Sequence, residues 1–310
     1  MATLTARISL KGDEPDGPED YLSTSLGVIF PDDIVNQHGD AEHSLLYASP
    51  KLPKTLLIEL ADPEGETDRR LFSHYLWNAS LLLAELIERD SLDEEEEEKQ
   101  DRGLGGDISF DTRGLNTLEL GAGTALPSIM AGLLGAAGVV VTDYPAPAVM
   151  KTLRENVARN IKPDLAPVGK SSLVTTSILV EGHEWGVFDS SSAFPSSHAH
   201  LSDRLFVADC LWMPWQHENL RRSIGYFLKK TAEARAWVVA GFHTGRAKMA
   251  PFFDAKALRE EGGVEVERMW ERDCDGVERE WDSEREDDIT ERKRWLVVCV
   301  LKRCEGMVDA

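Results

Sequence analysis

The amino-acid sequence predicts an α/β fold built on a seven-stranded sheet, with helices on both faces and an N-terminal extension. Short apolar stretches with the composition of strands alternate with helical patterns along most of the chain, which is typical of a parallel sheet. Only an acidic loop, residues 273–291, separates the last two strands, so we expect them to form a terminal antiparallel hairpin. The first sheet strand ends in the closely spaced glycines Gly121 and Gly123, which allow a sharp turn into the following helix.

The chain before the sheet predicts an extension in two parts. We expect residues 1–44 to be an acidic, partly disordered tail, because residues 11–20 combine charge with prolines and glycines. Residues 45–110 are predicted to hold a hairpin over Leu45–Leu60, then a helix and an acidic loop. The helix is indicated by apolar residues at helical spacing, namely Leu71, Tyr75, Ala79, Leu82, Leu83 and Leu86.

The acidic loop at residues 90–107 contains a run of adjacent glutamates followed by a glycine-rich stretch. Adjacent like charges repel one another and cannot enter a core, so we expect a solvated loop between two ordered parts. A docking loop for a basic partner is the functional alternative.

Residues 111–303 are predicted to form the core of the fold, and residues 304–310 a short tail. The expected strands are the short stretches at 115–120, 138–142, 173–180, 205–209, 236–242, 264–270 and 295–301. One helix is expected after the glycine turn, with Pro127 in its first turn. Further helices are expected at 147–160, 218–234 and 252–261.

The charge balance bounds the choice of partners. Lys and Arg number 34 and Asp and Glu number 55, which gives a net charge of −21. This charge repels phosphate backbones and anionic lipids, so we expect neither nucleic acid nor a membrane as partner, whereas it attracts a basic peptide. The longest nearly apolar run, Met130–Val141, is too short to cross a bilayer. The N-terminus lacks the apolar run of a signal peptide, so we expect a cytoplasmic protein.

No metal is expected, because neither the cysteines nor the histidines that stand out show the spacing of metal ligands. We expect reduced thiols and hydrogen-bonded structural histidines. These residues are Cys210, Cys274, Cys299, Cys304, His183, His217 and His243.

The glycine turn predicts a nucleoside-binding site. Gly121 and Gly123 allow the backbone to turn sharply and to approach a ligand closely. Leu126 stands where a dinucleotide-binding motif has its third glycine, and no lysine follows as in a P-loop, so both of these sites are excluded. Asp143, twenty residues after Gly123 at the end of the second strand, is placed to bond two ribose hydroxyls. An ordinary turn with an ordinary strand-end aspartate is the structural alternative.

Several separated blocks resemble a known family. The motifs LELGAGTALP and VVVTDYP resemble the first two motifs of seven-stranded S-adenosylmethionine-dependent methyltransferases. Four further blocks resemble the fungal nicotinamide N-methyltransferase-like family, also described as elongation factor 1-alpha N-terminal and lysine methyltransferases. They are SHYLWNASL at 73–81, HEWG at 183–186, ADCLWMPWQHENL at 208–220 and GFHTGRAKMAP at 241–251. The resemblance covers residues 45–303 and implies a Rossmann-like methyltransferase sheet.

The resemblance also implies roles for site residues. S-adenosylmethionine is implied to lie along the glycine turn, with Asp143 on its ribose, Trp185 and Glu184 near its adenine and Trp77 closing the site. The full implied set of cofactor contacts is Trp77, Glu119, Gly121, Ala122, Gly123, Asp143, Glu184, Trp185 and Ala208. Asp209 is implied to face the methyl group and the substrate amine as the catalytic residue. Trp212 is implied to wall the substrate channel, where related lysine methyltransferases often have tyrosine.

Structural interpretations of the same residues stay open at this point. Trp77 is also compatible with a place in the core, and Trp185 with a hydrophobic plug. Glu184 is also compatible with a solvated charge, and Asp209 with a helix N-cap. Ala125 replaces the third glycine of the methyltransferase motif, a small change that we expect to leave the fold intact.

The resemblance implies an S-adenosylmethionine-dependent N-methyltransferase that acts, as a monomer, on the N-terminal glycine and adjoining lysine of elongation factor 1-alpha. Methyl transfer needs a neutral amine, and an α-amine with a pKa of about 7.7–8.0 loses its proton more easily than lysine at about 10.4. The acidic charge favours a protein substrate. Nicotinamide methylation is the alternative from the older family description, and an inactive binding protein with this fold is the second alternative.

Overall fold

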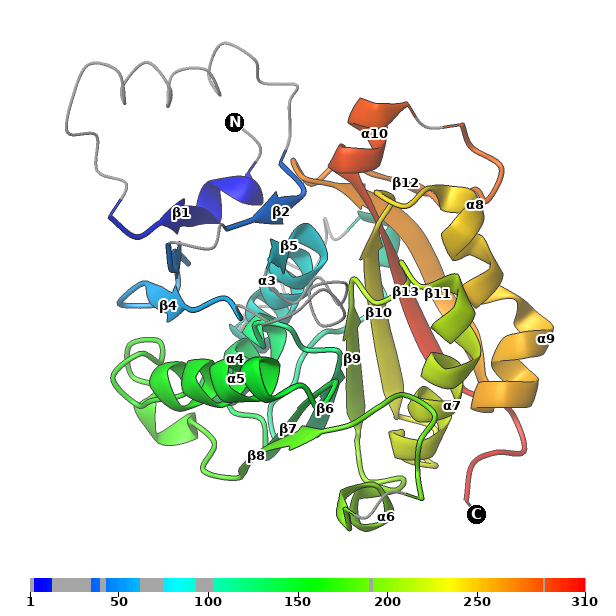
Figure 1. Ribbon diagram of the computed structural model, residues 1–310, viewed down its shortest axis with the longest axis horizontal. Coiled ribbons are helices and arrows are strands. Elements are labelled where there is room, and N and C mark those ends of the chain that lie inside the picture. The colour runs from blue at the N-terminus through cyan, green and yellow to red at the C-terminus, as the bar shows by residue number, and fades with distance from the viewer. Residues whose placement is uncertain are drawn as a thin grey trace.

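Figure 1 shows the computed structural model of the chain. It describes residues 3–12, 35–39, 43–61, 75–92, 103–189, 192–286 and 288–309. Most of the predicted 90–107 loop, most of residues 11–20 and Leu71 lie outside the described residues. The division of the chain at residues 44, 110 and 303 stays a prediction.

The described residues form an eight-stranded mixed sheet with the order β12-β11-β13-β10-β9-β6-β7-β8. Its strands are β6 (Asn116–Leu120), β7 (Gly138–Asp143), β8 (Ile178–Gly182), β9 (Arg204–Ala208), β10 (Arg235–Gly241), β11 (Val264–Asp273), β12 (Glu278–Glu280) and β13 (Trp295–Arg303). Strands β6 to β10 are mutually parallel, whereas β13 runs antiparallel to both β10 and β11. The predicted α/β class and terminal antiparallel hairpin are confirmed.

Strand β12 is a correction to the prediction of a plain loop at residues 273–291, and it raises the strand number from seven to eight. It has no apolar run, so the hydrophobic pattern does not reveal it. Instead, charged side chains of β12 pair with charged side chains of β11. Arg279 lies 2.7 Å from Glu271, and Glu278 lies 3.8 Å from Arg272. Cross-strand pairs of opposite charge stabilise an edge strand of this kind.

Helices cover both faces of the sheet (Figure 1). One face carries α3 (Asn78–Leu92), α4 (Leu126–Leu133) and α5 (Pro147–Asn160), and the other carries α7 (His217–Phe227), α8 (Arg246–Met249) and α9 (Ala255–Ala257). Side chains of β10 alternate between the two cores, since Trp237 and Val239 join the first core and Val238 joins the second. The remaining helical segments are α6 (Phe194–His198), α10 (Ile289–Arg294), η1 (Thr5–Arg7), η3 (Gly103–Gly105), η4 (Ser171–Leu173), η5 (Pro214–Gln216), η6 (Ala250–Phe253) and η7 (Leu258–Gly262).

Three predicted boundaries are wrong, each because of a tertiary contact or a local turn. The helix predicted from Leu71 onward begins at Asn78, because Leu76–Trp77 instead forms β5 and pairs with β2 (Gln37–His38). The helix predicted to reach residue 234 ends at Phe227, where the chain becomes extended at Leu228 and bridges to Ser202. The strand predicted from residue 173 begins at Ile178, after a turn of 3₁₀ helix.

The N-terminal part adds a small sheet of β1 (Ile8–Leu10), β3 (Leu45–Tyr47) and β4 (Leu56–Ile58). The β3–β4 pair is the hairpin predicted over residues 45–60, and it is antiparallel as expected. Strand β1 lies within the predicted tail of residues 1–44 and pairs with β3. No helix among the residues described is long and apolar enough to cross a membrane.

The strand order fixes where a ligand binds. Strands β6 and β9 are neighbours in the sheet, but the chain leaves β6 through α4 to β7 on one side and leaves β9 through α7 to β10 on the other side. A crevice forms at such a switch point, beyond the carboxyl ends of the strands.

Candidate active site

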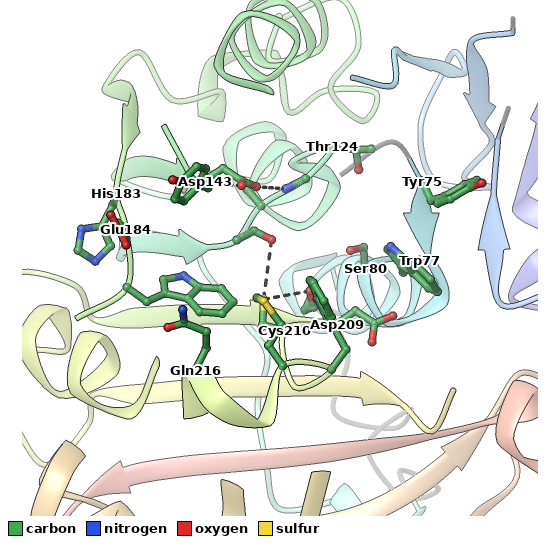
Figure 2. Close-up of a pocket in the computed structure, with 18 residues that line it drawn as sticks. Tyr75, Trp77, Ser80, Thr124, Asp143, His183, Glu184, Asp209, Cys210 and Gln216 are labelled. Carbon is green, nitrogen blue, oxygen red and sulfur yellow. Dashed lines mark hydrogen bonds between the residues drawn. The ribbon is translucent and has the colours of Figure 1, made fainter. Parts of the chain in front are cut away.

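A pocket lies at the carboxyl ends of β6, β7, β8 and β9, at the switch point of the sheet (Figure 2). Every predicted site residue except Glu119 lines it. These are Trp77, Gly121, Ala122, Gly123, Asp143, Glu184, Trp185, Ala208, Asp209 and Trp212. In Figure 2, Asp143, His183 and Glu184 lie at one end of the pocket, whereas Trp77, Ser80 and Asp209 lie at the other. The pocket therefore has two chemically different ends.

Glu119 lies behind the glycine turn rather than in the pocket. Its side chain is fully buried, and its carboxylate accepts a hydrogen bond from the backbone N–H of Ser128 at 3.1 Å and another from the Ser128 hydroxyl. Burial raises the pKa of Glu119 to about 8. Glu119 thus bonds the first turn of α4 in this structure, and its predicted contact with the cofactor stays a prediction.

The glycine turn brings backbone to the floor of the pocket. Gly121 has a φ of 66°, and a Cβ there would lie 2.8 Å from the sulfur of Cys210 and 2.9 Å from the indole of Trp185. The turn therefore packs directly against Trp185 and has no room for a side chain. Ala125, in place of the third glycine, also takes a left-handed conformation with a φ of 64°, so the turn is kept with alanine there.

Asp143 is held rigidly at the first end of the pocket. One carboxylate oxygen accepts the Gly123 N–H at 2.7 Å, and the other accepts the Tyr144 N–H at 2.7 Å. Burial raises the pKa of Asp143 to about 6, against these two hydrogen bonds. Each oxygen keeps a second lone pair, so the carboxylate can still accept hydroxyl donors from a ligand.

The loop after β8 supplies the residues next to Asp143. His183 bonds the hydroxyl of Ser223 at 3.2 Å, and that hydroxyl accepts the Gly186 N–H at 2.9 Å. Burial lowers the pKa of His183 to about 4, so the imidazole is neutral at physiological pH. The structure thus confirms the structural role expected of His183, which fixes the loop that presents Glu184 and Trp185.

Asp209 occupies the second end of the pocket. It follows β9 directly in a left-handed conformation with a φ of 58°, which is uncommon outside glycine and is often found at functional sites. Its carboxylate accepts the Gly241 N–H at 3.3 Å. Burial raises the pKa of Asp209, and the neighbouring His243 opposes this shift.

Aromatic side chains enclose the space around Asp209. Trp77 stacks on the ring of His243 at 4.6 Å between centroids with an interplanar angle of 20°, and Tyr75 meets the edge of Trp77. Trp212 lines the pocket from the loop after β9, and its ring lies 6.3 Å from that of Trp215. The second end of the pocket is thus an aromatic cage with one carboxylate.

His243 has a carboxylate neighbour that the sequence analysis does not identify. Its Nδ1 lies 3.8 Å from the carboxylate of Asp209. His217, by contrast, bonds the backbone carbonyl of Leu211 at 3.0 Å, as expected of a structural histidine.

The sequence prediction also missed several lining residues: Tyr75, Ser80, Thr124, Tyr144, His183, Cys210, Met213 and Gln216. Thr124 lies inside the motif GAGTALP, so its position next to the two glycines was the available indication. Its hydroxyl is buried and has no hydrogen-bond partner among the residues described.

The pocket favours transfer between two bound molecules without a covalent intermediate. Burial raises the pKa of the Cys210 thiol well above its usual range, and the sulfur bonds the Leu120 carbonyl at 3.3 Å, so this thiol is a poor nucleophile. The described residues contain no group of three or more His, Cys, Asp or Glu side chains that could hold a metal ion. At the second end of the pocket, the Asp209 carboxylate lies among the aromatic rings of Tyr75, Trp77 and Trp212.

Comparison with known proteins gives the family. Residues 65–257 match the lysine methyltransferase family. The protein N-terminal and lysine N-methyltransferase EFM7 of Gibberella zeae is 30% identical over 210 residues, which are 66% of this chain and 70% of that protein. Its counterpart from Aspergillus fumigatus is 29% identical over 67% of this chain and 70% of that protein.

Solved structures agree with the fold. A putative S-adenosylmethionine-dependent methyltransferase from Streptococcus mutans has a TM-score of 0.51 at 11% identity, over 92% of this chain and 65% of that one. A putative methyltransferase complexed with SAH has the same TM-score at 12% identity, also over 92% of this chain and 65% of that one. Because the family match spans more than half of the sequence, the chain belongs to the lysine methyltransferase family and is an N-methyltransferase.

Proposed function

We propose that this enzyme transfers the methyl group of S-adenosylmethionine to the N-terminal glycine and adjoining lysine of elongation factor 1-alpha. The observation that carries the proposal is the pocket with two ends, the glycine turn and Asp143 at one and Asp209 within an aromatic cage at the other. The first end suits a nucleoside, and the second suits an amine.

The residues present fit S-adenosylmethionine. The buried, unpaired hydroxyl of Thr124 is a polar group that a ligand must satisfy, since an unpaired buried hydroxyl costs free energy. A Cβ at Gly123 would meet nothing within 4 Å, so the backbone there is open to a ligand. Asp143 would hold the ribose hydroxyls, with Glu184 and Trp185 beside the adenine and Ala208 lining the pocket. When bound, the cosubstrate supplies an electrophilic methyl group on a sulfonium.

Asp209 and its aromatic neighbours suit an ammonium that must become a neutral amine. The carboxylate attracts and orients the cation, and the rings of Trp77 and Trp212 exclude water and favour a positive charge at their faces. An α-amine is the easier acceptor, because its pKa is about 2.5 units below that of lysine. We therefore propose methylation of the terminal glycine first and of the lysine second.

Two features support a protein substrate. The relatives from Gibberella zeae and Aspergillus fumigatus are both named protein N-terminal and lysine N-methyltransferases. The net charge of −21 favours association with a basic protein terminus. We propose that the enzyme acts as a monomer in the cytoplasm, which gel filtration and cell fractionation would test.

Trp215 provides a test of protein docking at the rim. Its side chain is 72% exposed and its ring lies beside that of Trp212, which lines the pocket. We expect Trp215→Ala to raise KM for the protein substrate by roughly 5- to 30-fold, because exposed tryptophans at interfaces often contribute about 1–2 kcal/mol. Steady-state kinetics with purified elongation factor 1-alpha measures this, and cosubstrate affinity should not change.

Ile289→Ala is the matched control for Trp215→Ala, because Ile289 is similarly exposed, at 74%, but lies on α10 and not on the pocket. An unchanged KM in Trp215→Ala, or equal effects in both variants, would remove Trp215 from the docking surface.

The titration of Asp143 predicts the pH dependence of cosubstrate binding. Ribose hydroxyls donate to the ionised carboxylate, so affinity is complete above the folded-state pKa of about 6 and is lost below it. We expect the Kd for S-adenosylmethionine to rise by up to about tenfold for each pH unit below that value. In Asp143→Asn, the Kd should be roughly 10- to 100-fold higher near neutral pH and should lack this component of the pH dependence.

Calorimetry from acidic to neutral pH measures both effects. Asp164→Asn serves as the control, because Asp164 is an exposed carboxylate paired with Lys54 outside the pocket. A wild-type Kd that stays constant across this range would contradict the proposed role of Asp143.

Labelled methyl transfer tests the acceptor directly. The enzyme is incubated with methyl-labelled S-adenosylmethionine and, separately, with elongation factor 1-alpha, with the same protein blocked at its N-terminus and lysines, and with nicotinamide. We expect label only in the unblocked protein. Label in nicotinamide would favour the small-molecule alternative, and no transfer despite cosubstrate binding would favour an inactive binding protein.

A further inference from the structure

His243 lies directly behind two pocket residues without lining the pocket itself. It follows β10, the strand beside β9, so it stands next to Asp209 at the same edge of the sheet. Its Nδ1 is 3.8 Å from the Asp209 carboxylate, and its ring stacks on Trp77. The side chain of Asp209 is 5% exposed, whereas that of His243 is 17% exposed. The imidazole thus connects the buried carboxylate to solvent.

We propose that His243 is a positioning residue for methyl transfer, which receives the substrate proton from Asp209 and keeps that carboxylate ionised and turned toward the amine. The inference rests on the proposed function, and it assigns how the acceptor loses its proton. Imidazole suits this step because one of its ring nitrogens can accept a proton while the other carries one.

The groups around His243 are a carboxylate and an aromatic face. Asp209, from the end of β9, is an ion-pair neighbour of the imidazole among the residues described. Trp77, from β5, is uncharged and presents its face, so it stabilises a cationic ring; Tyr75 in turn meets the edge of Trp77. Arg246, three residues after His243, bonds the buried carboxylate of Glu271 at 2.6 Å. The charge of this arginine is therefore paired with Glu271 and not with Asp209.

The proton and electrons balance as follows. The substrate ammonium gives a proton to the Asp209 carboxylate, and the resulting carboxyl passes it to Nδ1 of His243, in the tautomer that carries the ring's own proton on Nε2. The 3.8 Å gap shortens or is bridged by one water, as catalytic hydrogen bonds commonly tighten only when substrate binds. The neutral amine forms its bond to the methyl carbon while the carbon–sulfur bond breaks and leaves its electron pair on sulfur. His243 then releases the proton to water.

The test is the pH profile of His243→Asn, which keeps a polar group near the position of Nδ1 but cannot take up a proton. The acceptor is an N-terminal peptide of elongation factor 1-alpha with its lysine acetylated, so that the α-amine is the acceptor. Because the α-amine has a pKa of about 7.7–8.0, we expect kcat to fall about 10- to 100-fold near pH 7 and less than about threefold near pH 9.5. A merely structural role would lower kcat equally at every pH.

Three further measurements distinguish a role in proton transfer from a loss of folding or of cosubstrate binding. Asp209→Asn combined with His243→Asn should be no slower than Asp209→Asn alone, because both act on one proton path. His198→Asn, on α6 and outside the pocket, should leave the profile unchanged. The Kd for S-adenosylmethionine from calorimetry and the unfolding temperature of His243→Asn should match those of the wild type. If His243→Asn fails to fold, His243→Gln is used in its place.

The outcomes separate the two proposals. If the wild type methylates the peptide but the His243→Asn deficit is absent, is equal at all pH values or adds to that of Asp209→Asn, the inference on His243 is wrong. If the wild type methylates neither the α-amine nor the lysine of the unmodified peptide, the proposed function fails and this inference fails with it.

Discussion

Asp209→Asn should lower kcat by about 100- to 1,000-fold while the Kd for S-adenosylmethionine changes less than about twofold. The substitution removes the charge that attracts and deprotonates the ammonium, but it keeps the size of the side chain and an oxygen that can accept the Gly241 N–H. Asparagine also tolerates the left-handed backbone at this position, where φ is 58°, so the fold should be preserved. Single-turnover kinetics with elongation factor 1-alpha and calorimetry with the cosubstrate give the two numbers.

Asp203→Asn is the matched control for this variant. Asp203 immediately precedes β9, at the strand end opposite to Asp209, and bonds Asn116 and Lys229 outside the pocket. That control should lower stability and leave kcat unchanged. A kcat above half of the wild-type value in Asp209→Asn would remove Asp209 from the reaction.

Gly121→Ala should weaken cosubstrate binding at least about tenfold, because the new methyl group requires the ring of Trp185 and the sulfur of Cys210 to move out of contacts shorter than 3 Å. The left-handed backbone adds roughly 1–2 kcal/mol of strain in any non-glycine residue. Calorimetric titration with S-adenosylhomocysteine measures the affinity, and thermal unfolding measures the strain.

Gly114→Ala separates the two effects. Gly114 has a similar φ of 70°, yet a Cβ there would meet nothing within 4 Å, and it lies outside the pocket. This control should lower stability about as much as Gly121→Ala does, with cosubstrate affinity unchanged. Equal affinity losses in both variants would show that strain alone, and not displacement of Trp185, weakens binding.

The sheet was largely predictable because its strands are buried. The runs at 205–209 and 236–242 are almost entirely apolar, the run at 115–120 keeps leucines at both of its ends, and β6, β9 and β10 lie within one or two residues of these runs. The helix at 147–160 is confirmed at both ends, since Pro147 fits its first turn. Strand β8 is only half-buried along its length, and there the pattern placed the start five residues too early.

Pocket residues were predictable where a sequence motif lies at the end of a strand. They were not predictable where their role depends on a contact with a different strand or helix. The glycines, Asp143 and Asp209 all follow strand ends and all line the pocket. His243 was missed because its interpretation relied on neighbours along the chain, whereas Asp209 approaches it from the adjacent strand. Residues that follow the carboxyl ends of parallel strands lie at the ligand-binding edge of the sheet, as Asp209 does. His243, two residues after β10, has the same kind of position. The bonds of Glu119 to Ser128 join β6 to α4, so they too are contacts between elements that the local pattern does not show.

Peptide mapping of elongation factor 1-alpha by mass spectrometry, after turnover with S-adenosylmethionine, tests the central claim most directly. The account predicts added methyl groups that fragment ions assign to the α-amine of the terminal glycine and to the adjoining lysine. The same peptide from Asp209→Asn should remain unmodified while that variant still binds the cosubstrate. An unmodified N-terminal peptide from the active wild type, or methyl groups at other positions only, would contradict it.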